Sequence, residues 1–237
     1  MALRRVIRAL SELCVTAGAL IVLFVGYLLY WTGVQAGDAV AGQLDTLQQE
    51  WVDRPADAAP PAPPAAPRDP APGPAPAPAP YADGKGLAVM YVPRLGRDWE
   101  WPVLEGTRTG TLKKGLGHYA GTARLGQTGN FSVAGHRRTY GDPFKDFPRL
   151  RPGDAVVLTD GTTWFTYRVD RAPHRTVPTD IGVIDPVPRK SGFTGPGRYL
   201  TLTTCDPEWG SSHRLVVWAH LDATQPVTAG RPRALAG

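Results

Sequence analysis

The chain has 237 residues, which is enough for one ordinary domain with appended segments. Its 26 lysines and arginines exceed its 21 aspartates and glutamates, so the formal net charge is +5 at pH 7. A basic surplus suits a chain near anionic phospholipid or an anionic wall polymer. The basic residues form no clustered patch, so the sequence gives no indication of a nucleic-acid partner.

An uncharged segment near the N-terminus, residues 13–37, is long enough to cross a membrane. A transmembrane helix needs roughly 20 apolar residues. Arg4, Arg5 and Arg8 precede the segment, and flanking arginines stay on the cytoplasmic side, so the chain after Asp38 is expected outside. The sequence therefore predicts a single-pass plasma-membrane protein with a cytoplasmic N-terminus, anchored by its first 37 residues.

A cleaved signal peptide is the alternative interpretation of this segment. Val34, Gln35 and Ala36 resemble a small-residue cleavage site, whereas the apolar run exceeds the usual h-region of about 7–15 residues. The length favours a retained anchor. Cys14 lies within the segment, where it serves as a small apolar residue or a palmitoylation target, so it is not expected to pair with Cys205 on the outer side.

A short amphipathic helix is predicted directly after the anchor, over residues 38–54. Its apolar residues recur at helical spacing: Val40, Leu44, Leu47 and Trp51. From residue 55 to 80 the composition changes to 12 prolines and 10 alanines in 26 residues, which cannot bury a core. Residues 55–84 are therefore predicted to be a disordered stalk. At about 3.1 Å per residue, the 26 proline-rich residues of this stalk could hold the next domain up to roughly 80 Å from the membrane.

Residues 85–223 have the pattern of an all-β domain, followed by a flexible tail over residues 224–237. Short runs of strand-forming residues alternate with glycine, proline and aspartate. The predicted strands are residues 87–92, 99–104, 130–135, 155–159, 163–172, 198–204 and 214–221. Asp160-Gly161 predicts a hairpin turn, and a short helix is predicted near Phe144. Seven or eight strands in about 135 residues favour a closed or nearly closed barrel, with a sandwich as the nearest competitor.

Cys205 is the candidate nucleophile of this domain. A thiol on an oxidising outer face is open to oxidation and stray disulfides unless its reactivity is useful. It follows the alternating run R-Y-L-T-L-T-T and precedes Asp206-Pro207, where the missing proline N–H must end the strand. The thiol is therefore expected at the end of a strand. The competing interpretation is a buried, inert cysteine that packs like alanine.

A catalytic thiol needs a partner for its proton, because only the thiolate attacks well. His136 ends the run N-F-S-V-A-G-H at another junction of strand and loop, so it could face Cys205 if the two strand ends are neighbours. An ordinary loop histidine is the alternative. Arg214 opens a strand nine residues after the cysteine, where its guanidinium could stabilise an oxyanion or serve only as an edge arginine.

No metal or cofactor is predicted. The sequence has no C-x-x-C or H-x-x-x-H spacing, and structural zinc normally uses four clustered ligands. It has no acidic loop of EF-hand order either.

The run T-L-T-T-C with an arginine nine residues later, together with G-H-Y-A-G-T and N-F-S-V-A-G-H-R, resembles the sortase family, most of all the class E sortases of actinobacteria. The resemblance covers about Gly86 to Leu221. It implies a closed eight-stranded β-barrel with short helices. It also implies a cysteine transpeptidase that cuts a C-terminal sorting signal between threonine and glycine.

The resemblance also implies roles for particular residues. Cys205 would form the thioester, His136 would donate and accept the protons, and Arg214 would match the family's arginine. Thr204 is expected to contact the site or to serve only as a strand residue. His118 and Tyr119 match an element near the substrate groove.

The partners implied by the resemblance are secreted proteins with a sorting signal and an amine on a peptidoglycan precursor. Class E enzymes are associated with signals of the form L-A-x-T-G rather than L-P-x-T-G. The stretch after the cysteine, D-P-E-W-G-S-S-H-R, departs from many class E members, so Asp206 and Glu208 are expected to alter the charge of the groove.

Two other functions compete with this one. An L,D-transpeptidase also uses an extracellular cysteine and histidine on a β-rich fold, but its S-H-G-C signature is absent, because Thr203 and Thr204 precede the thiol. The second alternative is a stalked binding module with an inert cysteine.

Overall fold

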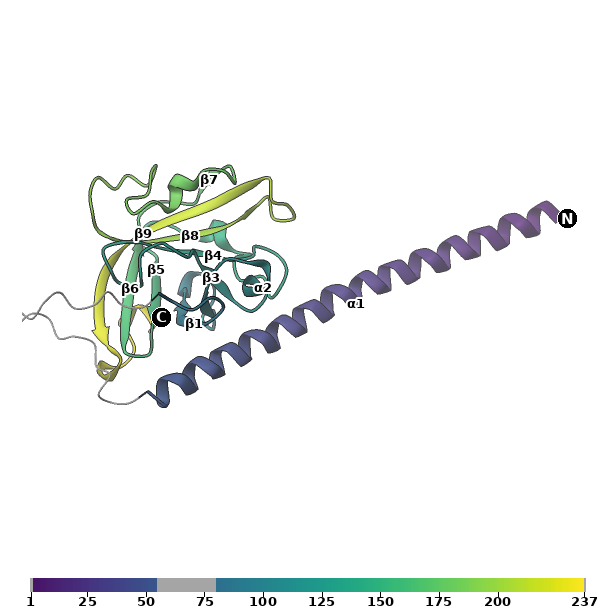
Figure 1. The fold of residues 1–237 in the computed structure, drawn as a ribbon. Helices are drawn as coiled ribbons and strands as arrows, with labels where there is room; N and C mark the ends of the chain where they lie inside the picture. The colour runs from purple at the N-terminus through teal and green to yellow at the C-terminus, as the bar shows by residue number, and fades with distance from the viewer. Residues whose placement is uncertain (1, 55–79, 237) are drawn as a thin grey trace, which may run out of the picture.

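The computed structural model describes residues 2–54 and 80–236 (Figure 1). Most of the predicted stalk, residues 55–79, lies outside the described residues. The two helices are α1, Ala2–Val52, and α2, Thr109–Leu112, and single 3-10 turns occur at Pro93–Leu95, Phe147–Arg149, Ile181–Ile184, Val227–Ala229 and Arg233–Leu235. The strands are β1 Gly86–Tyr91, β2 Glu100–Glu105, β3 Leu116–His118, β4 Gly129–Ala134, β5 Ala155–Thr159, β6 Thr163–Val169, β7 His174–Thr176, β8 Arg198–Asp206 and β9 His213–Pro226.

Eight of these strands close into a barrel. The hydrogen-bonded order is β6-β5-β1-β2-β3-β4-β8-β9, and β6 pairs again with β9 to complete the ring. Closure removes the free sheet edges that an open all-β fold would expose. The long β9 makes this possible, because its first half pairs with β8 and its second half with β6. The predicted closed eight-stranded barrel is confirmed, and β7 is a ninth strand added to β9 outside the ring.

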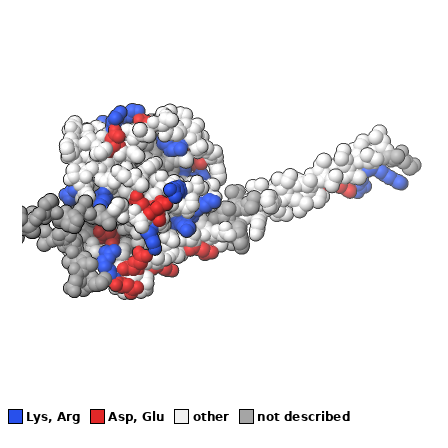
Figure 2. Space-filling view, viewed as in Figure 1, with Lys and Arg blue, Asp and Glu red and all other residues white. Residues whose placement is uncertain are grey.

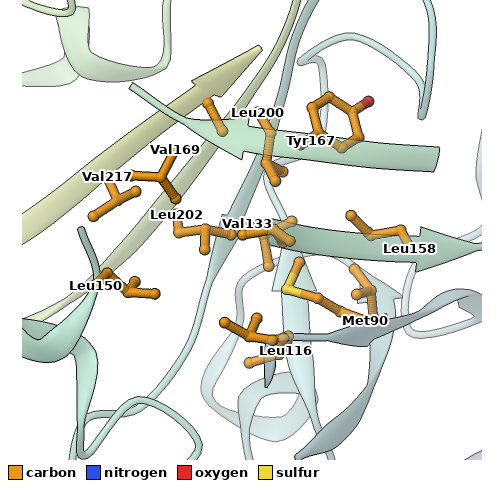
Figure 3. Close-up of a cluster of buried hydrophobic side chains, with 14 of the residues drawn as sticks. Met90, Leu116, Val133, Leu150, Leu158, Tyr167, Val169, Leu200, Leu202 and Val217 are labelled. Atoms are coloured by element: carbon orange, nitrogen blue, oxygen red, sulfur yellow. The ribbon is translucent and has the colours of Figure 1, made fainter. Parts of the chain in front are cut away.

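The barrel interior is filled by apolar side chains that alternate along the strands, as the two-residue period of a strand requires. Figure 3 shows Val133 of β4, Leu158 of β5 and Leu200 and Leu202 of β8 in this core, and all four are 0–1% exposed. Tyr167 reaches the same core, and its hydroxyl accepts a hydrogen bond from the Gly126 N–H at 3.2 Å. The alternate residues of β8 face outward, toward a smaller cluster described below.

A second apolar cluster covers the outer face of β8 and β9. It contains Val183, Val216 and Trp218, and the Trp218 ring N–H donates to the Val183 carbonyl at 3.0 Å. The segment between β7 and β8 is thereby fixed over the outward-facing side chains of β8. Thr201, which faces this side, is fully buried beneath it and donates to Asn130 Oδ1 at 2.9 Å.

The structure differs from the sequence-based expectations at several element boundaries. The three-residue strands β3 and β7 were not predicted, because so short a run shows no alternation. The expected helix near Phe144 is one 3-10 turn, Phe147–Arg149. The strand expected over residues 163–172 ends at Val169.

Both ends of the folded domain extend beyond their expected limits. Tyr81 packs on the barrel with Arg124 stacked 3.8 Å from its ring centroid, so the ordered domain begins before residue 85. At the other end β9 runs to Pro226, and the segment expected to be a flexible tail continues along the barrel. There Pro232 is buried and Arg231 stacks on Tyr91 with 5.4 Å between guanidinium carbon and ring centroid.

The N-terminal helix α1 is continuous through the expected boundary at residue 37. Its part Leu3–Tyr27 is long and apolar enough to cross a membrane and is unburied by the rest of the protein. Figure 2 shows this part as largely uncharged, with Lys and Arg gathered near its far end. The opposite end of α1 packs against β1 and β2 (Figure 1).

Candidate active site

The parallel pairing of β4 with β8 brings two of the predicted catalytic residues to one rim of the barrel. Ala134 is in register with Thr203, and the pairing continues past the strand end through the Gly135 N–H, which donates to the Thr203 carbonyl at 3.1 Å. His136 and Cys205 each lie two residues beyond this register pair. Parallel neighbours end at the same edge of a sheet, so both side chains emerge together.

Cys205 and His136 line the same cavity of about 310 Å³. Cys205 is a partly buried free cysteine. The remaining lining comes from the loop after His136 and from the turn between β8 and β9: Arg137, Arg138, Thr139, Glu208, Trp209, Gly210 and Ser211. The thiol and the imidazole, 69 positions apart in the sequence, therefore share one hollow.

The surroundings of the His136 imidazole favour its neutral form. Burial is the main cause that keeps the pKa of His136 below its usual value, and the positive charge of Lys113 adds to it. The Lys113 Nζ lies 5.1 Å from the Tyr140 ring centroid, and that ring lies 5.2 Å from the His136 ring. The buried His136 Nε2 has no hydrogen-bond partner within the described part of the chain. A neutral imidazole with an uncommitted nitrogen is suited to take up a thiol proton.

Arg214 lies directly across from Cys205 in the antiparallel register of β8 and β9. Side chains at opposed positions project from the same face with Cβ atoms about 4.5–5.5 Å apart, so both side chains start from the same face of the sheet. Arg214 Nη1 donates to the carbonyls of Ser211 and His213, both at 2.9 Å. A guanidinium has five N–H donors, so these two bonds orient it without exhausting its donors.

Arg214 also lines a second cavity, of about 80 Å³, on the outer side of β8. Its lining is mostly apolar and comes largely from the segment after β7: Thr176, Val177, Pro178, Asp180, Ile181, Val183 and Ile184, with Tyr119, Thr203 and Val216. The Tyr119 and Thr203 hydroxyls are 2.9 Å apart and hydrogen-bonded. Tyr119 therefore lines a cavity, and its expected contact with substrate stays a prediction.

Thr204 and His118 line neither of these cavities. Thr204 is 2% exposed, and its hydroxyl donates to the Gly135 carbonyl at 2.9 Å, which joins β8 to the strand before His136. His118 is 1% exposed, with Nδ1 2.6 Å from Glu105 Oε2 and Nε2 2.9 Å from the Thr122 hydroxyl.

Asp206 holds the rim together, a role that sequence reasoning missed. Its Oδ1 lies 2.6 Å from Arg137 Nη1, and its Oδ2 lies 2.6 Å from Arg175 Nε. The hydrogen bond from Arg175, and then that from Arg137, hold the pKa of Asp206 below its usual value. The residue after the nucleophile is thus tied to the residue after His136. The paired arginines could not be inferred from the sequence, because they lie 69 and 31 positions away.

The described residues contain no group of three or more histidine, cysteine, aspartate or glutamate side chains that could hold a metal ion. A thiol at a barrel rim, an imidazole in the same cavity and a guanidinium on the adjoining strand are the groups that cysteine acyl transfer on a closed β-barrel would need.

Comparison with known proteins agrees with that class. The family model of the sortase domain matches residues 90–222. Sortase SrtE1 of Streptomyces coelicolor is 36% identical over 235 residues, which cover 96% of this chain and 60% of the relative's length. Sortase SrtE2 of the same organism is 30% identical over 95% of this chain and 85% of its own. This chain belongs to the sortase family of cysteine transpeptidases.

Solved structures place it among the class E sortases of actinobacteria. Sortase E from Streptomyces avermitilis shares 74% sequence identity with a TM-score of 0.63, over 65% of this chain and 99% of that chain. Sortase E1 from S. coelicolor, solved with a tripeptide in the active site, shares 39% identity with a TM-score of 0.60, over 65% of this chain and 99% of its own. The family predicted from the sequence is confirmed.

Proposed function

We propose that this chain is a membrane-anchored sortase that cuts a C-terminal sorting signal between threonine and glycine and transfers the protein to an amine of a cell-wall precursor. The observation that carries the proposal is the shared cavity of Cys205 and His136, with Arg214 opposite the thiol on the next strand. The apolar part of α1 is the anchor, with Arg4, Arg5 and Arg8 at its N-terminal end on the cytoplasmic side and the barrel outside.

The first half of the reaction forms a thioester. The Cys205 thiol gives its proton to His136, and the sulfur attacks the threonine carbonyl. The electron pair of the carbonyl moves to its oxygen, which the Arg214 guanidinium stabilises. When the tetrahedral intermediate collapses, the bond to the glycine nitrogen breaks and His136 returns the proton to the leaving amine. The products are a thioester on Cys205 and a free glycyl peptide.

The second half reverses these steps with a different amine. The incoming amine attacks the thioester carbonyl and loses a proton to His136, after which the carbon–sulfur bond breaks. The departing sulfur recovers the proton and the thiol is restored. The neutral state of His136, which follows from its lowered pKa, supports its use as the base in this half.

The two cavities support separate routes for the two substrates. The cavity with Tyr119 and Arg214 is lined mostly by apolar groups and suits an extended signal with a leucine and a small second residue. The cavity on the side of His136 carries the Glu208 carboxylate, which attracts an incoming ammonium group. Arg138 lies 3.5 Å from Glu208 and tempers that attraction. We assign the first cavity to the sorting signal and the second to the acceptor.

The test uses purified residues 81–237 with L-A-x-T-G and L-P-x-T-G peptides and a panel of amines, and it identifies the products by mass. The solved S. avermitilis relative is matched over 99% of its length by 65% of this chain, which supports using the barrel region alone. We expect cleavage after threonine, faster for the alanine peptide, and an amide product when an amine is present. Cys205→Ala should abolish both products.

Two results would contradict the proposal. Absence of any cleaved peptide with folded protein would leave the non-catalytic binding module as the better interpretation. Products from folded Cys205→Ala protein would show that the thiol is not the nucleophile. The family assignment already decides against the L,D-transpeptidase alternative.

A further inference from the structure

The part of α1 beyond the membrane span lies against the barrel. Ala36, Val40 and Leu47 are 2%, 9% and 2% exposed, and Trp51 is half-buried. Their spacing of four, seven and four residues puts them on one face of the helix. Residues of the span itself, Leu3–Tyr27, are unburied by the rest of the protein. The apolar stripe that predicted an amphipathic helix therefore has a partner, and that partner is the barrel.

The barrel side of this contact contains two glycines that leave room for helix side chains. A Cβ atom added at Gly86, the first residue of β1, would lie 2.6 Å from Leu47 Cδ2. A Cβ added at Gly161, in the turn between β5 and β6, would lie 2.3 Å from Trp51 Cγ. Both separations are shorter than real contacts between carbon atoms. The side chains of Leu47 and Trp51 therefore occupy the space that the Cβ of any other residue at positions 86 and 161 would fill.

Gly86 and Gly161 are glycines for different physical reasons. Gly161 has a φ of +85°, so the hairpin turn requires glycine there whether or not the helix is present. Gly86 is not among the residues with positive φ. The close approach of Leu47 accounts for the missing side chain at Gly86.

We propose that this face of the barrel, defined by Gly86 and Gly161, is a docking surface for the chain's own membrane helix, and that docking holds the active site toward the bilayer. The contact at Leu47 is 10 residues beyond residue 37, where the uncharged run ends. At 1.5 Å per residue this sets a height of about 15 Å along the helix axis. The docked helix fixes the position of the barrel. The proline-rich segment, which would allow a reach of roughly 80 Å if extended, does not set it.

The orientation of the docked barrel follows from Figure 1. The turn between β8 and β9, which adjoins Cys205 and Arg214, projects toward the side on which α1 runs to its N-terminus. The N-terminal part of α1 is the membrane span. The mouth of the site therefore faces the bilayer. We infer that the docked enzyme acts on sorting signals held close to the membrane, and this inference rests on the proposed function.

The docking itself is tested by a disulfide in the full-length chain, reconstituted in lipid vesicles. The variant combines Leu47→Cys and Gly86→Cys, with Cys14→Ala and Cys205→Ala to remove the native thiols, and carries a protease site between residues 55 and 79. A sulfur at the Leu47 Cγ position would lie 2.7 Å from the Cβ of residue 86, which is compatible with a disulfide. Asp45, exposed on the other side of the helix, supplies the matched control as Asp45→Cys with Gly86→Cys.

After mild oxidation and protease cleavage, most of the Leu47→Cys pair should remain linked as one species, and the Asp45→Cys pair should separate into two fragments. If both pairs separate to the same extent, the docked arrangement is wrong. This readout needs no catalytic activity, so it decides the docking even if the proposed function fails.

The consequence for activity is tested with Leu47→Glu, which places a charge in the contact, in the otherwise native chain. One substrate is a soluble sorting peptide, and the other is the same peptide attached to the vesicle by a lipid. We expect Leu47→Glu to cut the soluble peptide within about twofold of the unmodified rate and the tethered peptide at least fivefold more slowly. Gln48→Glu, at an exposed position of the helix, should change neither rate. Equal effects of Leu47→Glu on both peptides would refute the orienting role.

Discussion

Replacing Asp206 by asparagine tests how the rim of the active site is held together. The Asp206 carboxylate pairs with Arg137, which is 10% exposed, and with Arg175, which is 54% exposed. Breaking a fully buried pair costs about 3–5 kcal/mol, whereas an exposed pair contributes at most about 1 kcal/mol. The Arg137 pair retains some contact with water, and an asparagine oxygen still accepts one hydrogen bond. We therefore expect the free energy of unfolding at pH 7 to fall by about 2–3 kcal/mol.

The assay is thermal unfolding of residues 81–237. For a domain of this size 1 kcal/mol corresponds to about 2–4 °C, so the melting temperature of Asp206→Asn should fall by about 5–10 °C. Asp222→Asn is the matched control, because Asp222 pairs with Arg168 at 3.0 Å but both side chains are well exposed. We expect that control to melt within about 2 °C of the unmodified protein.

The pH dependence separates a charge effect from a packing effect. Because the pKa of Asp206 is lowered in the folded protein, its stabilisation is full above the unfolded value of about 3.9 and is lost as the pH falls through the folded value. The gap in melting temperature between the two proteins should therefore be the same at pH 7 and pH 5 and should shrink below about pH 4. A gap that persists unchanged in acid, or no gap at pH 7, would refute the ion-pair explanation.

Further predictions concern the catalytic groups and the core. His136→Ala should lower kcat/KM for the sorting peptide by at least about 100-fold while the protein melts normally; a folded variant with full activity would remove His136 from the mechanism. Lys113→Met should raise the pKa of His136 and move the acid limb of the pH profile of kcat/KM to higher pH, whereas an unmoved limb would show that Lys113 does not act on the imidazole. Tyr119→Phe should raise the KM for the peptide severalfold with little change in stability, because only the hydrogen bond to Thr203 is lost; an unchanged KM would place the peptide elsewhere. Leu202→Ala, at 1% exposure in the barrel core, should reduce the free energy of unfolding by about 2–5 kcal/mol in denaturant titrations, and a change below about 1 kcal/mol would contradict the packing described here.

Local patterns in the sequence determined the elements that carry the site. The long uncharged run before Asp38 predicts a helix that is long enough to span a membrane, because a spanning segment must pair its backbone groups internally. The alternating run before Cys205 and the proline at position 207 set the thiol at the end of a strand. Each of these conclusions depends on neighbouring residues, whose side chains fix local geometry without knowledge of the rest of the fold. Strands of three residues, such as Leu116–His118, carry too little of that pattern to be found.

Only the tertiary structure decided which of these local features meet. Whether His136 faces Cys205 depends on the parallel register of β4 and β8, and the hydrogen bonds of the closed barrel set that register, not the residues beside either group. The ion pairs of Asp206 with Arg137 and Arg175 likewise depend on the tertiary structure. The apolar stripe that contains Leu47 predicted an amphipathic helix but not the surface that buries the stripe. An amphipathic helix can bury its apolar face against any surface of complementary shape. Here that surface is the enzyme's own barrel, and the physical reason is shape: a glycine at position 86 leaves space that Leu47 fills.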